Sequence, residues 1–528
     1  MKTIVFAIVF LLILQKSGIS KELDNIGNDL SAVIKNNITL EAGQRASVYV
    51  IYGDKNFSEN FGKDFGNADE EYNIGSLSKL FIGAQIVRLS DLGKINLDDS
   101  VFKYLPELKN KYKTNIKISD LLTDHTYLPY TYPYKIKSTG DVLNFLKNNE
   151  DILRYDNVYN RSQIDSDILL LIIERIEKST FSDSMDSLFK KFNLSNTSFI
   201  DSQKSNQFSF SDRFYSSSGN IGQFINSLML DKNLSKSIFA RFENTPYDQD
   251  LYFTPCFESQ NITLIDQNNN YDKYSLFYQY DNEKNSFIFV IPEKKFAVIL
   301  LSNFPVSIDK EKYISRLLLK TTVKDFLKMD IFDYRSTLSL KKVDEKDDYL
   351  SSYMGFFENN NGIIEFHVVD NNLMCSMDNK FYNVKFYDDG SFSLYPVDNS
   401  GDYIKEFRFR FTYINGIRYL SLLNFGQSLT FAREIEQPQY DDIWKERLGK
   451  WVSSDNGSDI KEMDIEKFRG FYILKYDDLA RGETNLLLVP VSDDSAKIVD
   501  FGDQLITFQS GDQDSSFNFL GINFVKKK

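Results

Sequence analysis

Apolar positions in the first two-thirds of the chain follow two spacings, which predict strands and helices within one mixed domain. Residues 46–52 form an apolar run typical of a buried strand, and residues 53–56 are typical of a hairpin turn. From Leu80 to Leu89, apolar residues recur at helical spacing until Gly93 ends the helix. The same spacings predict a helix core at 168–174, strands at 286–291 and 296–301, and a helix over 309–329.

Beyond residue 347 the pattern changes to short, aromatic-rich strands separated by turn residues. Regular strands with turn signals predict an antiparallel barrel, with one larger β-sandwich as the alternative. A second unit begins near residues 448–451, and residues 351–357 resemble its start in the first unit. The predicted strands of the first unit are 356–357, 363–369, 373–377, 380–387, 392–396, 407–413 and 419–423.

These patterns predict an α/β (α+β) domain over 21–335 and a charged linker over 336–347. A β-barrel-like domain over 348–436 and a second one over 437–528 follow. The chain has 528 residues, more than one hydrophobic core usually organises, which agrees with several domains.

The first 20 residues have the features of a secretory signal. Lys2 precedes an apolar run over 4–14, and the small residues Gly18 and Ser20 come before Lys21. We therefore expect a secreted protein, or one in the lumen of the secretory pathway. The apolar run is too short to span a bilayer, and no later stretch stays apolar for longer, so no integral membrane association is expected.

The net charge, the histidines and the cysteines bear on which partners and cofactors the protein can have. The chain carries 62 basic and 75 acidic residues, a net charge of −13, which argues against nucleic acid as a partner. The only histidines are His125 and His367, without clustered ligand spacing, so neither a metal nor another cofactor is predicted. Cys256 and Cys375 fall in different predicted domains; they either pair in an oxidising compartment or remain buried thiols.

A candidate nucleophile stands where a turn gives way to a helix, in the sequence Ser76-Leu77-Ser78-Lys79. Residues three apart on a helix share a face, so the Lys79 amine can reach the Ser76 hydroxyl. Backbone N–H groups of the first turn can stabilise negative charge that develops on a substrate oxygen. A serine needs a neighbouring base, and a lysine serves as one only in an enclosed site that lowers its pKa. Ser76 and Lys79 are the predicted catalytic residues.

The surroundings of this pair carry a family resemblance. Residues 65–69 read FGNAD, residues 89–108 read LSDLGKINLDDSVFKYLPEL, and residues 116–129 read IKISDLLTDHTYLP. In order and spacing they resemble the serine β-lactamase and penicillin-binding-protein superfamily, in particular its class C β-lactamase, esterase and D-aminopeptidase branch. The resemblance implies an antiparallel sheet flanked by helices and an acyl-enzyme at Ser76. It also implies that the β-rich tail consists of lipocalin-like barrels, as in some D-aminopeptidases.

The second motif of this branch, tyr-x-asn, is altered. It supplies a tyrosine that shuttles protons and precedes a helix ending in ile-ile-glu, which matches residues 168–174. An ungapped count places Arg161-Ser162-Gln163 on the motif, whereas a six-residue insertion places Tyr155-Asp156-Asn157 there. We favour the ungapped version and keep Tyr155 as the alternative. Arginine cannot accept a proton, although its charge would favour the free amine of Lys79.

The third motif, his-x-gly or lys-thr-gly, has no counterpart. The corresponding stretch, residues 274–280, contains neither histidine nor glycine, and bulky side chains there should crowd the substrate. The similar letters at 137–140 come too early in the chain. His125 falls one position after the family histidine, so we expect a structural role for it.

Two function hypotheses follow. The first, which we favour, is a secreted serine hydrolase that acts on an ester or a small amide or peptide through a Ser76 acyl-enzyme, with Lys79 as base. The second is a catalytically degenerate relative that serves as a scaffold or holds a ligand in a barrel of the tail. β-Lactam breakdown is disfavoured, because no group is available to hold the antibiotic carboxylate.

Overall fold

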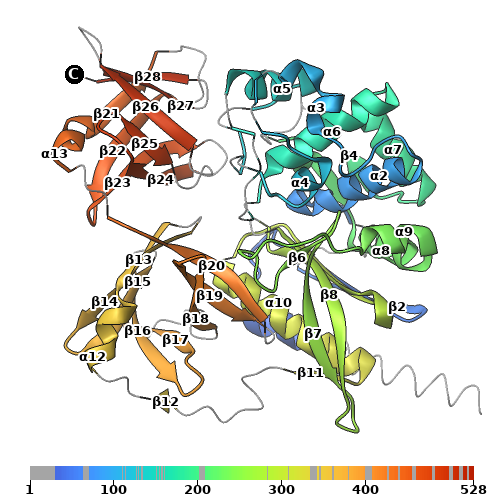
Figure 1. Ribbon diagram of the computed structural model, residues 1–528. Helices are drawn as coiled ribbons and strands as arrows, with labels where there is room; N and C mark the ends of the chain where they lie inside the picture. Colours follow the sequence, from blue (N-terminus) through green and yellow to red (C-terminus); the bar gives the residue numbers. More distant parts are fainter. Residues whose placement is uncertain are drawn as a thin grey trace, which may run out of the picture.

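The structure is a computed structural model of an α/β domain followed by two β-barrels (Figure 1). The predicted signal segment, residues 1–20, lies outside the described residues. The described residues are 30–527 except 63–69, 110, 113, 127, 129, 133–134, 150–151, 154, 156–158, 160, 201–208, 282–283, 307, 333–341, 344–346, 360–361, 378–379, 399–406, 425–426, 438–440, 455–459, 479–481, 499–503, 511–514 and 520–521.

An eight-stranded antiparallel sheet organises the first domain. The predicted strands at 46–52, 286–291 and 296–301 are confirmed as β1, β9 and β10, and β1 pairs with β10 along its whole length. This pairing joins the two ends of the domain. The strand order is β11 (Asp330–Ile331), β7 (Glu258–Ile265), β8 (Tyr271–Asp281), β9 (Ser286–Ile291), β10 (Phe296–Ser302), β1 (Ala46–Tyr52) and β2 (Lys55–Phe61), with β6 (Tyr252–Phe253) beside β7.

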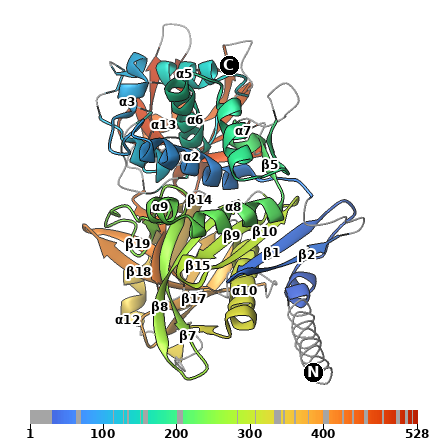
Figure 2. The ribbon, with the colours of Figure 1, turned by 90° about the vertical axis from the view of Figure 1, so that its right-hand side faces the viewer.

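Helices cover both faces of this sheet, which explains why β9 and β10 are buried at every position. Side chains alternate between the faces of a strand. Ile299 of β10 packs in the core under α8 (Ser218–Leu230), whereas Val298 packs against α10 (Ile308–Thr322). Figure 2 shows α8 over one face and α10 over the other. The helix predicted over 309–329 ends as α10 at Thr322 and continues as a π-helical turn to Leu327.

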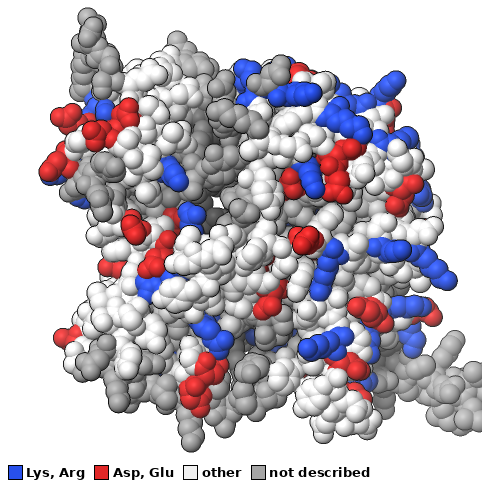
Figure 3. Space-filling view, in the orientation of Figure 1, with Lys and Arg blue, Asp and Glu red and all other residues white. Residues whose placement is uncertain are grey.

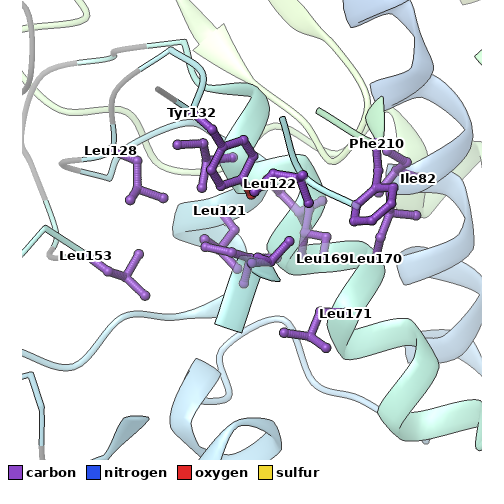
Figure 4. Packing of buried hydrophobic residues seen from close by; sticks show 14 of the residues in the cluster. Ile82, Leu121, Leu122, Leu128, Tyr132, Leu153, Leu169, Leu170, Leu171 and Phe210 are labelled. Atoms are coloured by element: carbon purple, nitrogen blue, oxygen red, sulfur yellow. The ribbon is translucent and has the colours of Figure 1, made fainter. Parts of the chain in front are cut away.

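A helical layer stands above α8 and is built around two buried helices, α2 (Lys79–Asp91) and α6 (Gln163–Glu177). Both are apolar on most of their surface, as expected for helices in the centre of a core. Figure 4 shows Leu121 and Leu122 packed among Leu169, Leu170 and Ile82. Further helices of this domain are α3 (Val101–Tyr104), α4 (Ile118–Leu122), α5 (Thr139–Asn148), α7 (Phe181–Lys191) and α9 (Lys232–Ile238), and residues 30–37 are also helical.

The first barrel closes through eight antiparallel strands in chain order, so the predicted barrel is confirmed and the sandwich alternative is wrong. All seven predicted strands are present. The eighth strand, β20, is not predicted, because polar residues such as Ser428, Thr430 and Arg433 interrupt its apolar positions. The strands are β13 (Gly355–Asn359), β14 (Gly362–Val369), β15 (Asn372–Met377), β16 (Lys380–Tyr387), β17 (Phe392–Pro396), β18 (Arg408–Ile414), β19 (Ile417–Asn424) and β20 (Gln427–Ile435).

A second closed barrel of eight strands follows. It repeats the start of the first, because each barrel begins with a four-residue helix, a 3-10 turn and a strand that opens on glycine, Gly355 in one and Gly449 in the other. The strands are β21 (Gly449–Ser453), β22 (Glu462–Phe468), β23 (Phe471–Asp478), β24 (Gly482–Pro490), β25 (Ser495–Ile498), β26 (Gln504–Ser510), β27 (Ser515–Phe519) and β28 (Ile522–Lys526).

Aromatic side chains pack inside both barrels. In the first, the ring of Phe411 lies 5.1 Å from the rings of both Phe366 and Phe392, measured between centroids. In the second, the Phe508 ring lies 5.3 Å from that of Trp444 and 5.4 Å from that of Trp451. Barrels of eight strands are just wide enough for side chains to fill. Such a barrel can also hold one small ligand, and here the aromatic clusters fill part of each interior.

Polar and apolar contacts connect the three parts of the chain. Gln249, in the loop before β6, donates hydrogen bonds of 3.0 Å to the Ser421 and Thr430 hydroxyls of the first barrel. The two barrels meet where the rings of Phe356 and Phe471 pack edge to face with centroids 5.0 Å apart. The loop before β6 thus ties the first domain to the first barrel.

Several smaller expectations can be placed on this fold. Within the predicted linker, residues 342–343 form β12 (Lys342–Val343), which pairs with β16, whereas residues 336–341 and 344–346 lie outside the described part. Cys256 and Cys375 are buried free thiols. Among the described residues, no helix is long and apolar enough to span a membrane, and no three metal-ligating side chains cluster. On the face in Figure 3, acidic and basic side chains are interspersed.

A buried carboxyl in α6 makes the stability of this fold depend on pH. Asp167 accepts hydrogen bonds from the Ser209 hydroxyl and from the amides of Phe210 and Ser211, and burial raises its pKa from 3.8 to about 6. Between these two pKa values the native state binds more protons than the unfolded state. The free energy of unfolding should therefore fall as pH rises from about 4 to 6, by roughly 3 kcal/mol from this residue.

Asp167→Asn should remove this contribution to the slope. Urea unfolding of both proteins between pH 4 and 7 gives the difference in their free energies of unfolding at each pH. We expect the wild type to lose stability relative to the variant as pH rises through this window. A difference that stays constant with pH would contradict a raised pKa at Asp167.

Candidate active site

Ser76 is held by a small sheet and a tight turn. Strand β3 (Tyr72–Asn73) pairs with β5 (Phe214–Ser216), and the Asn73 side chain accepts a hydrogen bond of 3.0 Å from the Gly75 amide. Such a side-chain contact two residues on is typical of asparagine in turns. The chain then makes a 3-10 turn over Gly75–Ser78 and enters α2 at Lys79. Ser76 thus lies in the turn before α2, with its side chain half-buried.

Lys79 forms an ion pair with Asp124. The ammonium Nζ lies 2.5 Å from Asp124 Oδ2, and the two side chains are 15% and 3% exposed. Asp124 follows α4 and adopts a left-handed backbone with φ of 52°, which aspartate tolerates better than most residues. Among the described residues no hydrogen bond joins the Ser76 hydroxyl to Lys79. A protonated amine is a donor only, so Lys79 in this state does not activate Ser76.

The backbone amide of Ser76 is also engaged by a carboxylate. It donates a hydrogen bond of 2.8 Å to Oδ2 of Asp281, the buried last residue of β8. A Cβ atom on Gly75 would lie 1.8 Å from this oxygen, so only glycine at position 75 allows the approach. Lys284 holds Asp281 from the other side, through its amide at 3.1 Å from Oδ1 and its ammonium at 3.7 Å from Oδ2.

Arg161 stands immediately before α6, where the ungapped count places the second motif. Its guanidinium donates a hydrogen bond to the backbone oxygen of Tyr280. Burial lowers the pKa of the Arg161 guanidinium, but the neighbouring Tyr159 and Glu258 raise it by more. The net shift is upward, so Arg161 stays charged. The charge of Asp124 contributes to this shift. The charge of Asp124 thus acts on Arg161 as well as on Lys79, its ion-pair partner.

Neither tyrosine before α6 contacts Lys79 among the interactions of the described residues. Tyr155 is 43% exposed and stacks on His125 with ring centroids 6.5 Å apart, as a rim aromatic would. Its predicted motif partners at 156–157 lie outside the described residues. The Tyr159 hydroxyl donates to Glu258 at 2.8 Å, and burial followed by the Glu258 charge raises its pKa well above the usual range. Neither geometry suits a proton shuttle to Ser76.

His125 is a buried histidine with both ring nitrogens engaged. Nδ1 lies 3.0 Å from the Thr123 hydroxyl and Nε2 lies 3.1 Å from the Asp248 carboxylate. Asp248 belongs to the loop that contacts the first barrel. The contacts agree with the structural role expected for His125 and place it beside Asp124.

The stretch at 274–280 is strand β8, and its side chains divide between the two faces of the sheet. Tyr278 and Tyr280 point into the core under α10, whereas Phe277 packs on the side of the helical layer. Phe277 contacts Phe239, with ring centroids 4.9 Å apart. Among the interactions of the described residues, the side chain of this strand that contacts Ser76 is the carboxylate of Asp281 rather than an aromatic ring.

Two further buried acids have raised pKa values. Burial, followed by the charge of Asp124, raises the pKa of Asp165 well above its usual range, and the carboxyl accepts a hydrogen bond from Thr126. Burial and the charge of Asp281 do the same to Glu311 of α10. Ion pairs join Lys79 to Asp124 and Lys284 to Asp281, and Tyr159 donates a hydrogen bond to Glu258.

Sequence reasoning missed Asp124 and Asp281, the two carboxylates that engage the candidate pair. For Asp124 a signal exists, because it stands where the family motif has histidine, one position before His125. For Asp281 the only signal is an acidic residue at the end of the strand that lacks the third motif.

The chain is similar to known proteins over part of its length. The family model described as Beta-lactamase matches residues 40–322, more than half of the chain. Protein flp of Staphylococcus aureus (strain NCTC 8325 / PS 47) is 26% identical over 172 residues, which are 29% of this chain and 34% of that protein. A Beta-lactamase of Psychrobacter immobilis is 36% identical over 88 residues, 16% of this chain and 20% of that protein. The matched part thus spans about a third or less of these relatives.

Solved structures show likeness over longer stretches. A class C beta-lactamase is 18% identical with a TM-score of 0.46, covering 57% of this chain and 96% of that one. The structure titled "Crystal structure of SurE with D-Leu" is 11% identical with a TM-score of 0.53, covering 78% of this chain and 99% of that one. The second likeness extends beyond the segment matched by the family model and concerns the fold alone.

Removing the charge of Asp124, the ion-pair partner of Lys79, should lower the free energy of unfolding. Asp124→Asn keeps a side chain that tolerates the left-handed backbone but leaves a buried ammonium without its counter-ion. We expect a loss of roughly 2–4 kcal/mol in the free energy of unfolding, measured with urea. The control Asp98→Asn removes a carboxylate that pairs with Lys117 but is 77% exposed, and should leave the midpoint nearly unchanged. Equal midpoints for both variants would contradict a stabilising ion pair.

Proposed function

Because this chain belongs to the β-lactamase family, we propose that it is a serine hydrolase that forms an acyl-enzyme at Ser76. The substrate class is an ester or a small amide or peptide. The observation that carries the proposal is the placement of Ser76 in the turn that opens α2, with Lys79 as the first residue of that helix. The groups that now engage the pair are two side chains, which can rotate, rather than backbone that fills the site.

The reaction requires two changes in this site. Asp281 must release the Ser76 amide, and Lys79 must be present as the free amine. The Ser76 oxygen then bonds to the substrate carbonyl carbon while its proton passes to Lys79, and the carbonyl oxygen takes up the amide of Ser76. The bond to the leaving group breaks as that group receives the proton. Water hydrolyses the acyl-enzyme and restores Ser76.

Arg161 limits the roles available at the second motif. A guanidinium that stays charged cannot accept the serine proton, so Lys79 is the only basic candidate beside Ser76 among the described residues. We propose an electrostatic role for Arg161: its charge shares Asp124 with Lys79 and so weakens the hold of that carboxylate on the lysine. We propose that Tyr155, which is exposed at the rim of the site, lies beside the entrance for the substrate.

A catalytically degenerate scaffold is the second candidate. The ion pair between Lys79 and Asp124 favours it, since a protonated lysine leaves the Ser76 hydroxyl without a base. The carboxylate on the Ser76 amide favours it for the same reason, because it occupies a donor that a hydrolase needs. A scaffold function predicts that the serine never becomes covalently modified.

Covalent labelling decides between the two candidates. A fluorophosphonate probe reacts with activated serines, and mass spectrometry of the digested protein locates the adduct. We expect an adduct on Ser76 in the wild type and in the control Ser90→Ala, which alters a serine on the same helix, but none in Ser76→Ala. Equal labelling of Ser76→Ala, or no adduct on folded wild type at high probe concentration, would contradict the hydrolase.

We also propose that the chain is exported by its first 20 residues. The basis is their sequence alone, with Lys2 before the apolar run and small residues before Lys21. When the full chain is produced in a cell with a secretory pathway, the mature protein in the medium should begin at Lys21, as read by N-terminal sequencing. Retention inside the cell with Met1 in place would contradict export.

A further inference from the structure

The carboxylate of Asp281 accepts the hydrogen bond that the oxyanion of an acyl transfer at Ser76 would need. In acyl transfer to a serine, the carbonyl carbon bonds to the serine oxygen, and the carbonyl oxygen becomes negative beside the backbone amide of that same residue. Here the Ser76 amide already donates to Asp281 Oδ2 at 2.8 Å. A resident anion at this donor takes its hydrogen bond and repels a second negative charge, strongly so in a buried site.

The fold holds both partners of this hydrogen bond in place, the Asp281 carboxylate and the turn that carries Ser76. Asp281 is 1% exposed and is fixed by the last pair of the β8–β9 ladder, opposite Ser286. The glycine at position 75 provides the space for the carboxylate, since any side chain there would collide with it. A buried carboxylate held by two backbone amides, those of Ser76 and Lys284, is a specific interaction rather than a surface accident.

A second partner, the Lys284 ammonium, lies close to the same carboxylate. The Lys284 ammonium lies 3.7 Å from Oδ2, in the same turn that holds Oδ1. A small rotation of the side chain can therefore exchange the Ser76 amide for a shorter contact with Lys284. Asp281 would then leave Ser76 without becoming an unpaired buried anion, which would be costly.

We propose that Asp281 is an autoinhibitory latch that mimics the oxyanion and keeps Ser76 unreactive until a substrate carbonyl displaces it towards Lys284. The inference rests on the proposed hydrolase function and adds its regulation. Asp281 is a positioning residue in this account, because it acts through the amide of Ser76 and touches no reacting atom once displaced.

The rate of Ser76 labelling tests the latch. Asp281→Ala empties the position, and Asp281→Asn removes the charge while keeping a side chain that can cap the turn at Lys284. Loss of one oxyanion-hole donor usually costs 100-fold to 1000-fold in rate, so we expect Asp281→Ala to label at least about tenfold faster than wild type. Asp281→Asn should fall between the two. The control Asp272→Ala, on an exposed position of the same strand, should label at the wild-type rate.

A second readout does not depend on catalysis. With selective serine labelling, the amide proton of Ser76 should move upfield in Asp281→Ala, because it loses a charged acceptor, and should stay in place in Asp272→Ala. An unmoved resonance would overturn the latch. Equal labelling rates in wild type and both Asp281 variants would also overturn it while the hydrolase stands. No labelling of any folded variant would overturn the hydrolase, even if the resonance moves as expected.

Discussion

The state of this site depends on one hydrogen bond, from the backbone amide of Ser76 to the carboxylate of Asp281. It connects the turn that opens α2 with the end of β8, so the helical layer and the sheet meet at the candidate nucleophile. The donor is the one that a serine acyl-enzyme uses to stabilise its oxyanion. In the proposed hydrolase, this contact must open before the Ser76 amide can stabilise an oxyanion.

Burial explains why the surrounding charges come in pairs. An isolated ion in a site of this kind would be expensive, so Lys79 is matched by Asp124 and Tyr159 donates to Glu258. For Asp165 and Glu311, neither of which has an ion pair among the described residues, burial raises the pKa well above its usual range.

The fold was largely predictable from the sequence, whereas the state of the site was not. Strands such as β1 and β10 are apolar runs bounded by turn residues, and periodicity locates them within a residue or two. Ser76 and Lys79 are three residues apart, so local spacing alone places both at the start of α2. Asp124 and Asp281 reach them across 45 and 205 residues of chain, and contacts over such separations do not appear in local spacing.

The most direct test of a latched hydrolase is a crystal structure of the chain with a phosphonate covalently bound to Ser76. The phosphonyl oxygen imitates the oxyanion. The account predicts that this oxygen accepts the Ser76 amide and that the Asp281 carboxylate has turned to the Lys284 ammonium. A structure in which Asp281 still accepts the Ser76 amide while the phosphonyl oxygen lies elsewhere would contradict it.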